Sequence, residues 1–157
     1  MERRPSMTEW LAEKYVPGFS AEHRAPADLL SFRAYGHAAA RAVGGRFIEE
    51  PPRRVPRSHD TALVALRDAT IRVLLHNELP LLAFAIYYPD REGSCDYDFI
   101  DAPDVARAFG EAFVPVLKRA LDAPCDLLAL ERAVGRDRDI AYWAPRSLGA
   151  ILYNFWD

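Results

Sequence analysis

The sequence predicts an α+β protein in which several helices pack on a small, largely antiparallel sheet with a single layer of strands. Three observations support this class. Helix-capping patterns open several segments, an apolar run rich in β-forming residues lies near the middle of the chain, and a second strand follows that run closely enough to pair with it as a hairpin. The 157 residues, half of them hydrophobic, fit one globular domain over 1–157.

Two helices and a short strand are expected in the first 50 residues. Ser6 and Glu9 have the spacing of a capping box, which predicts a helix that ends at Tyr15. Asp28 suits the positive end of a second helix, which a Gly-Gly pair terminates. A short strand could follow over 46–50.

The segment 51–58 reads PPRRVPRS and is expected to be an exposed loop, because proline cannot donate a ladder hydrogen bond. It carries the main basic cluster of the chain: Arg53, Arg54 and Arg57. Arginine in a loop is a natural grip for an anion. An anion-binding regulatory domain is therefore one functional alternative.

The next segment, 60–76, predicts one continuous helix. At 100° per residue, Leu63, Ile71 and Leu74 fall on a broad apolar side, into which Arg67 intrudes.

The dipeptide His59-Asp60, at the start of this segment, resembles the central dipeptide of the HD metal-dependent phosphohydrolases. The resemblance would imply an all-helical fold and further metal ligands, for which His37 and Asp101 are the nominees. The strong strand signals of this chain do not fit that fold, so a loop histidine beside a helix cap is the preferred interpretation.

Two strands are expected next. The run 81–88 is apolar on both faces and predicts a central strand, and 95–100 predicts its hairpin partner. Asp101 and Asp104 then suit the start of a helix over 102–121, which Pro115 should kink.

The C-terminal part gives weaker signals. Residues 126–134 are compatible with a helix or a strand, 139–143 predict a strand, and 145–155 predict a final helix. Two aromatic side chains precede the final helix, and two others lie at its C-terminal end, outside the face expected to pack in the core. Together they form a candidate anchor patch for a partner. They are Tyr142, Trp143, Tyr153 and Trp156.

Acidic residues concentrate between 88 and 104. Six acidic residues oppose Arg91 alone there, so the local net charge is −5, larger than the −3 of the whole chain. Four of them, together with the aromatic patch, are the candidate partner-binding residues: Asp90, Glu92, Asp96 and Asp98. This strand face has three interpretations: a solvated edge, a surface for a cationic partner, or a carboxylate pair for a metal or for acid–base chemistry.

Composition narrows the classes of function. The negative net charge disfavours a general nucleic-acid binder, and the longest apolar run is too short to cross a membrane. Two cysteines without a CxxC spacing, and no secretory leader, predict a cytoplasmic protein with reduced thiols. No cofactor or metal motif is found.

These observations favour a small protein-binding module that presents an acidic face to a basic protein partner. Toxin-neutralising immunity proteins of bacteria have this general character. The enzymatic alternative is a small metal-dependent hydrolase that uses Asp96 and Asp98 with His37 or His59. A homo-oligomer formed through the C-terminal aromatics is compatible with either.

Overall fold

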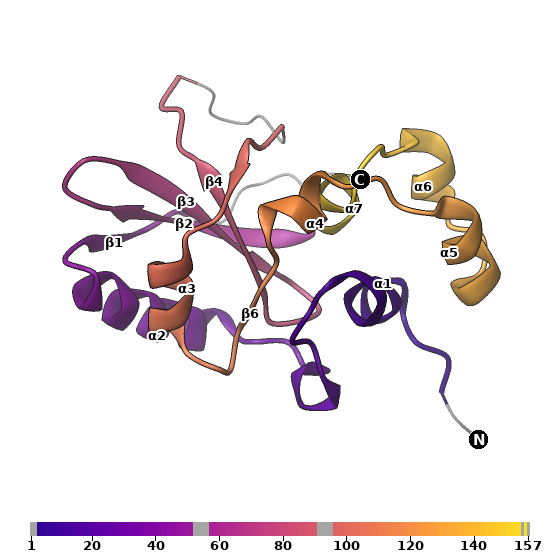
Figure 1. The fold of residues 1–157 in the computed structure, drawn as a ribbon, viewed down its shortest axis with the longest axis horizontal. Helices are drawn as coiled ribbons and strands as arrows, with labels where there is room; N and C mark the ends of the chain where they lie inside the picture. The colour runs from indigo at the N-terminus through magenta and orange to yellow at the C-terminus, as the bar shows by residue number, and fades with distance from the viewer. Residues whose placement is uncertain (1–2, 52–56, 91–95, 155, 157) are drawn as a thin grey trace.

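The computed structural model describes residues 3–51, 57–90, 96–154 and 156. Within these ranges the chain forms seven α-helices and one mixed, mostly antiparallel open sheet of six strands (Figure 1). The predicted α+β class and single layer of strands are confirmed. None of the helices in the described ranges has the length and hydropathy needed to cross a bilayer.

Five strands lie in sequence order across the sheet, each antiparallel to the next, and a sixth pairs in parallel with β4. They are β1 (Arg46–Glu49), β2 (His59–Ala65), β3 (Thr70–His76), β4 (Leu81–Ile86), β5 (Phe99–Ile100) and β6 (Val114–Pro115). The predicted strand near 46–50, the central strand and its hairpin partner are therefore confirmed. The partner strand is shorter than expected.

The predicted helix over 60–76 is wrong, because this segment is the β2–β3 hairpin. Its register pairs Ala65 with Thr70, and Leu66 N donates to Ala69 O at 2.8 Å to close the turn. Both faces of β2 and β3 are covered, so nearly every position is buried. The apolar residues therefore do not alternate with polar ones, and the run mimics a broad helical face. The intruding Arg67 marks the turn.

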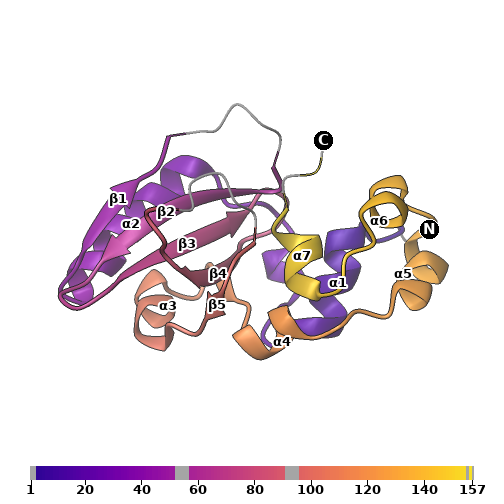
Figure 2. The ribbon, with the colours of Figure 1, turned by 90° about the horizontal axis from the view of Figure 1, so that it is seen from above.

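Seven helices surround the sheet. They are α1 (Met7–Tyr15), α2 (Leu29–Ala42), α3 (Pro103–Phe109), α4 (Lys118–Asp122), α5 (Leu127–Val134), α6 (Arg138–Trp143) and α7 (Leu148–Leu152). In both views α1 and α4 to α7 gather beyond one end of the sheet, away from α2 and α3 (Figure 1; Figure 2).

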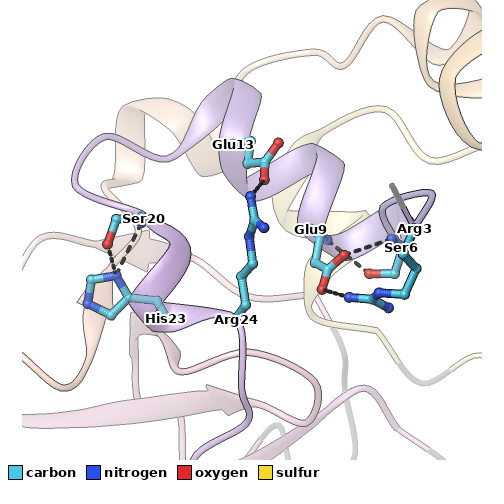
Figure 3. A network of polar contacts seen from close by, with 7 residues as sticks. All are labelled: Arg3, Ser6, Glu9, Glu13, Ser20, His23 and Arg24. Atoms are coloured by element: carbon cyan, nitrogen blue, oxygen red, sulfur yellow. Dashed lines mark hydrogen bonds and ion pairs between the residues drawn. The ribbon is translucent and has the colours of Figure 1, made fainter. Parts of the chain in front are cut away.

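The capping box predicted for α1 is confirmed. Ser6 Oγ accepts from Glu9 N at 3.1 Å, and Glu9 Oε2 accepts from Ser6 N at 3.0 Å (Figure 3). Arg3 forms an ion pair with Glu9 at 2.7 Å. The hydrogen bond from the Ser6 backbone contributes most to lowering the pKa of the Glu9 carboxyl, and the contacts with Arg3 lower it further. Further along, Arg24 pairs with Glu13 at 2.8 Å, which ties the loop after the 3-10 helix Ala21–His23 back to α1.

Helix α2 and helix α3 cover one face of the sheet. The ring of Phe32 on α2 lies 5.7 Å from that of Phe47 on β1 and 6.0 Å from that of Phe109 on α3. A Cβ atom at Gly36 would come within 2.3 Å of the Phe47 ring, so only glycine allows α2 to approach β1 this closely. On the other face Leu74 packs with side chains of α1, α4, α5 and α7 in a second core.

The predicted helix over 102–121 is wrong as a single element. It ends at Phe109, because Gly110 adopts φ 91°, a conformation that favours glycine, and the chain then forms β6 and α4. Pro115 lies in β6 and kinks no helix.

The C-terminal elements are all helical. Residues 126–134 resolve as helix α5, capped by Asp126, whose side chain accepts from Ala129 N at 2.9 Å. The predicted strand over 139–143 is wrong, because Asp137 caps α6 by accepting from the backbone of Asp139 and Ile140. The final helix, α7, is shorter than the predicted 145–155.

Candidate functional site

The acidic residues beside β5 lie at an edge of the sheet. Asp90, Asp96 and Asp98 are exposed. Tyr88 Oη donates to Asp98 Oδ2 at 2.7 Å, and Ile86 N donates to Asp98 O at 2.9 Å, so the end of β4 holds this residue in place through its side chain and its backbone. Glu92 and Cys95 lie outside the described residues.

Asp101 caps a different helix from the one predicted. The N-cap of α3 is Ala102, which offers no side-chain cap. Asp101 Oδ1 instead accepts from Lys118 N at 2.9 Å, at the start of α4. The carboxylate therefore joins the end of β5 to a helix 17 residues further along the chain.

Carboxylates gather around Lys118. Its Nζ donates to Asp122 one turn along α4, and the ammonium also lies in the field of Asp98 and Asp101. The hydrogen bond to Asp122, followed by these negative charges, raises the pKa of Lys118. One ammonium faces three carboxylates, so this part of the surface stays negative.

An apolar groove of ≈ 500 Å³ opens beside this acidic group, between α3 and the β6–α4 segment. Phe84 of the central strand contributes to its lining, and Leu117, which is 44% exposed, lies at its mouth. Its apolar lining is Phe84, Ala102, Pro103, Ala106, Gly110, Phe113, Pro115, Val116 and Leu117.

The charges around the groove are predominantly acidic. Asp101, Arg107 and Glu111 line it, and Arg107 pairs with Asp104 at 3.5 Å. Within the lining, Asp101 and Glu111 oppose Arg107, for a net charge of −1, and the exposed Asp98 and Asp104 add negative charge beside it. Within the described ranges the Glu111 carboxylate makes no ion pair with any cation.

A buried cluster of histidine and tyrosine lies at the end of the sheet near α7. His59 Nε2 lies 2.8 Å from Tyr97 Oη, and the rings of His59 and His76 stand edge-on to Tyr153 at 5.5 and 6.0 Å. Tyr153 Oη donates to Leu81 O at 3.0 Å, and burial raises the pKa of this phenol. Burial also lowers the pKa of His76 to about 4.

Ser58 lies beside this cluster, with its Oγ 3.3 Å from His59 Nδ1. A serine hydroxyl has one proton to donate, and Ser58 gives it to Leu152 O at 2.6 Å while accepting from Asn154 N. His59 therefore does not receive the Ser58 proton in this arrangement, and the pair does not have the geometry of an activated nucleophile. The contacts instead fasten the C-terminal segment to the sheet.

The HD resemblance does not extend to the geometry. His59 and Asp60 follow each other on strand β2, so they point to opposite faces. His37 contacts Glu49 on β1. In the part of the chain that the structure describes, no three His, Cys, Asp or Glu side chains come together as a metal site.

Three of the four predicted anchor aromatics meet at the surface. Tyr142 and Trp143 of α6 are 79% and 46% exposed, their rings lie 5.1 Å apart, and Trp143 stacks on Trp156 at 6.4 Å. The exposure expected for Tyr153 is wrong, because this residue is 1% exposed. It follows α7 directly and turns into the core that it shares with Leu81.

Of the three arginines in the proline-rich segment, the structure describes Arg57 only. Its side chain is mostly buried and lies 3.7 Å from Asp60. Arg53 and Arg54 fall outside the described residues, so the anion site stays a prediction.

The groove and Lys118 are the features that the sequence reasoning missed. A helix over 102–121 would have placed Phe113 and Leu117 in a buried stripe, whereas Gly110 and Pro115 redirect the chain. Comparisons with protein families, curated proteins and solved structures find no match to this chain.

Proposed function

We propose that this chain is a protein-binding module that takes a basic, amphipathic segment of a partner protein in the groove between α3 and β6–α4. The observation that carries the proposal is the pairing of an apolar groove of ≈ 500 Å³ with a lining of net charge −1, beside which lie the exposed carboxylates of Asp98 and Asp104. Apolar side chains of such a partner would fill the groove, and lysine or arginine residues flanking them would neutralise the negative charge around it. A basic toxin that this chain neutralises is the partner class that the sequence favours.

The acidic residues have a physical role in this function. Exposed carboxylates close together repel one another in the free protein, and a cationic partner relieves that repulsion. Long-range attraction of this kind raises the association rate more than it raises affinity, and salt screens it. Asp90, Asp96 and Asp98 would steer the partner, and the groove would hold it.

The test uses fluorescence anisotropy with a labelled amphipathic peptide of leucine and lysine, matched to one of leucine and glutamate. We expect only the lysine peptide to bind, with affinity that falls as salt is raised. Glu111→Lys should weaken binding about five-fold, the effect of losing an exposed attraction worth up to about 1 kcal/mol. Ala106→Trp, which fills the groove from α3, should weaken it as well.

The matched control is Glu131→Lys on α5, which makes the same charge change at an exposed residue away from the groove. Equal losses for Glu111→Lys and Glu131→Lys would show attraction to the net charge alone. Equal binding of both peptides would remove the basic-partner proposal.

A further inference from the structure

Strand β6 has an outer backbone edge with which no strand of the described chain pairs. Its inner edge is bonded to β4, because Val114 N donates to Pro80 O at 2.9 Å and Val116 N donates to Leu82 O at 2.8 Å. The backbone groups of successive residues in a strand point alternately to one side and to the other. Those of residues 113, 115 and 117 therefore point away from β4.

Three of these outward groups are free to form hydrogen bonds. Phe113 N already donates to Gly110 O, Pro115 has no N–H, and Leu117 O accepts from the first turn of α4. The groups that remain are Phe113 O, Pro115 O and Leu117 N, for which the described part of the chain supplies no partner. The outer edge of β6 thus offers two acceptors followed by one donor.

The same three residues line the apolar groove between α3 and the β6–α4 segment. The side chain of Phe113 belongs to the core on the α3 face of the sheet, as does that of Phe84, which also lines the groove. Residues opposite each other on neighbouring strands direct their side chains to the same face. In an extended chain beside β6, every second side chain would therefore enter the groove.

Carboxylates lie at both ends of this edge. Glu111 lines the groove two residues before Phe113, and Asp101 lines it at the other end, where its carboxylate accepts from Lys118 N at 2.9 Å. Residues 113 to 117 span about 13 Å, because a strand rises about 3.3 Å per residue. Basic side chains at the two ends of a bound stretch of this length would lie near the two carboxylates.

We propose that the basic segment of the partner binds in an extended conformation, as an additional strand on the outer edge of β6. This inference rests on the proposed function and specifies the segment that the groove takes: apolar side chains at every second position, with lysine or arginine between them and at the ends. Hydrogen bonds to Phe113 O, Pro115 O and Leu117 N hold its main chain. An amphipathic helix would leave this edge unused, because its backbone groups bond to one another.

The first experiment compares two labelled peptides of about 15 residues, a length at which a helix can form. Both contain leucine and lysine in equal amounts, but one alternates them and the other places its leucines at helical spacing. In fluorescence anisotropy with the full chain, we expect the alternating peptide to bind about ten-fold more tightly, the lower end for three backbone hydrogen bonds. Equal or tighter binding of the helical peptide would overturn the strand inference and leave the proposed function standing. Binding of neither peptide would overturn both.

Two modified peptides test the backbone hydrogen bonds directly. In the alternating peptide, N-methylation of the three central leucines removes donors from one edge of the strand, and N-methylation of the three central lysines removes donors from the other edge. Because only one edge can face β6, we expect one of these peptides to lose binding and the other to keep it. Equal binding of the two would overturn the proposal.

A variant of the chain tests the donor of the edge. Leu117→Pro removes this N–H, and the φ of −69° at Leu117 is one that proline adopts, so the backbone is kept. Leu117→Ala is the matched control, because it removes the same side chain and keeps the N–H. We expect Leu117→Pro to bind the alternating peptide about five-fold more weakly than Leu117→Ala, the effect of one net hydrogen bond. Equal affinities of the two variants, both with native circular dichroism, would contradict pairing at this edge.

Discussion

Among single residues, His76 is a buried side chain whose charge state the fold controls. It is 4% exposed, its Nδ1 accepts from Glu78 N at 3.1 Å, and burial lowers its pKa from 6.5 to about 4. The neutral form is therefore the one that fits the core, and protonation is coupled to unfolding.

The sign of this coupling predicts a pH dependence of stability. Between pH 6.5 and about 4 the unfolded chain binds a proton at His76 that the folded chain does not, so stability falls as pH falls through this window. From about pH 7.5 to about pH 5 the loss should be about 2 kcal/mol, because each unit of pKa difference is about 1.4 kcal/mol. Urea denaturation at the two pH values measures it.

His76→Gln should remove most of that loss, since glutamine does not titrate. His37→Gln, at an exposed histidine on α2, should keep it. An unchanged loss in His76→Gln would assign the pH dependence to another group.

Among the elements, those with local signals were predicted and those fixed by distant contacts were not. The capping box of Ser6 and Glu9 and the cap of Asp28 specify α1 and α2 within a few residues of sequence. The run that forms β4 is apolar on both faces, as a central strand requires. These signals do not depend on the rest of the fold.

The β2–β3 hairpin shows why the same reasoning failed elsewhere. When both faces of a strand are buried, the alternation of polar and apolar residues disappears and the helical period is also satisfied. The β-branched Val64, Ile71 and Val73, with Arg67-Asp68 between the strands, were the local signs of a hairpin. At the candidate site, the exposure of the acidic residues could be predicted from composition. The groove could not, because it depends on β6, which exists only by pairing with β4.

The hairpin also makes a prediction about stability. Leu74 on β3 is 0% exposed and packs in the core between the sheet and the α1 side of the molecule. Leu74→Ala should cost about 2–5 kcal/mol, the range for a large-to-small change in a core that cannot collapse. Leu30→Ala, at a residue of α2 that is 76% exposed, should change stability by no more than about 0.5 kcal/mol. Chemical denaturation compares the two, and similar small values would place Leu74 at the surface.

For the molecule as a whole, the groove and the exposed aromatic residues of α6 differ in charge and lie on different elements. The charged residues that line the groove at α3 have a net charge of −1, whereas the surface around Tyr142 and Trp143, with Arg138 and Asp139, has none. Residues in separate surfaces with no shared contacts act additively in binding. We therefore expect changes at the aromatic residues of α6 to leave binding in the groove unaffected.

This independence is testable with variants that each affect one surface. Tyr142→Ala with Trp143→Ala should leave the anisotropy titration with the leucine–lysine peptide unchanged, because no aromatic of α6 lines the groove. Glu111→Lys, by contrast, should weaken peptide binding, because this residue lines the groove. If the α6 variant lost peptide binding while its circular dichroism stayed native, the peptide would be bound through the aromatic cluster, and the groove would not be the partner site.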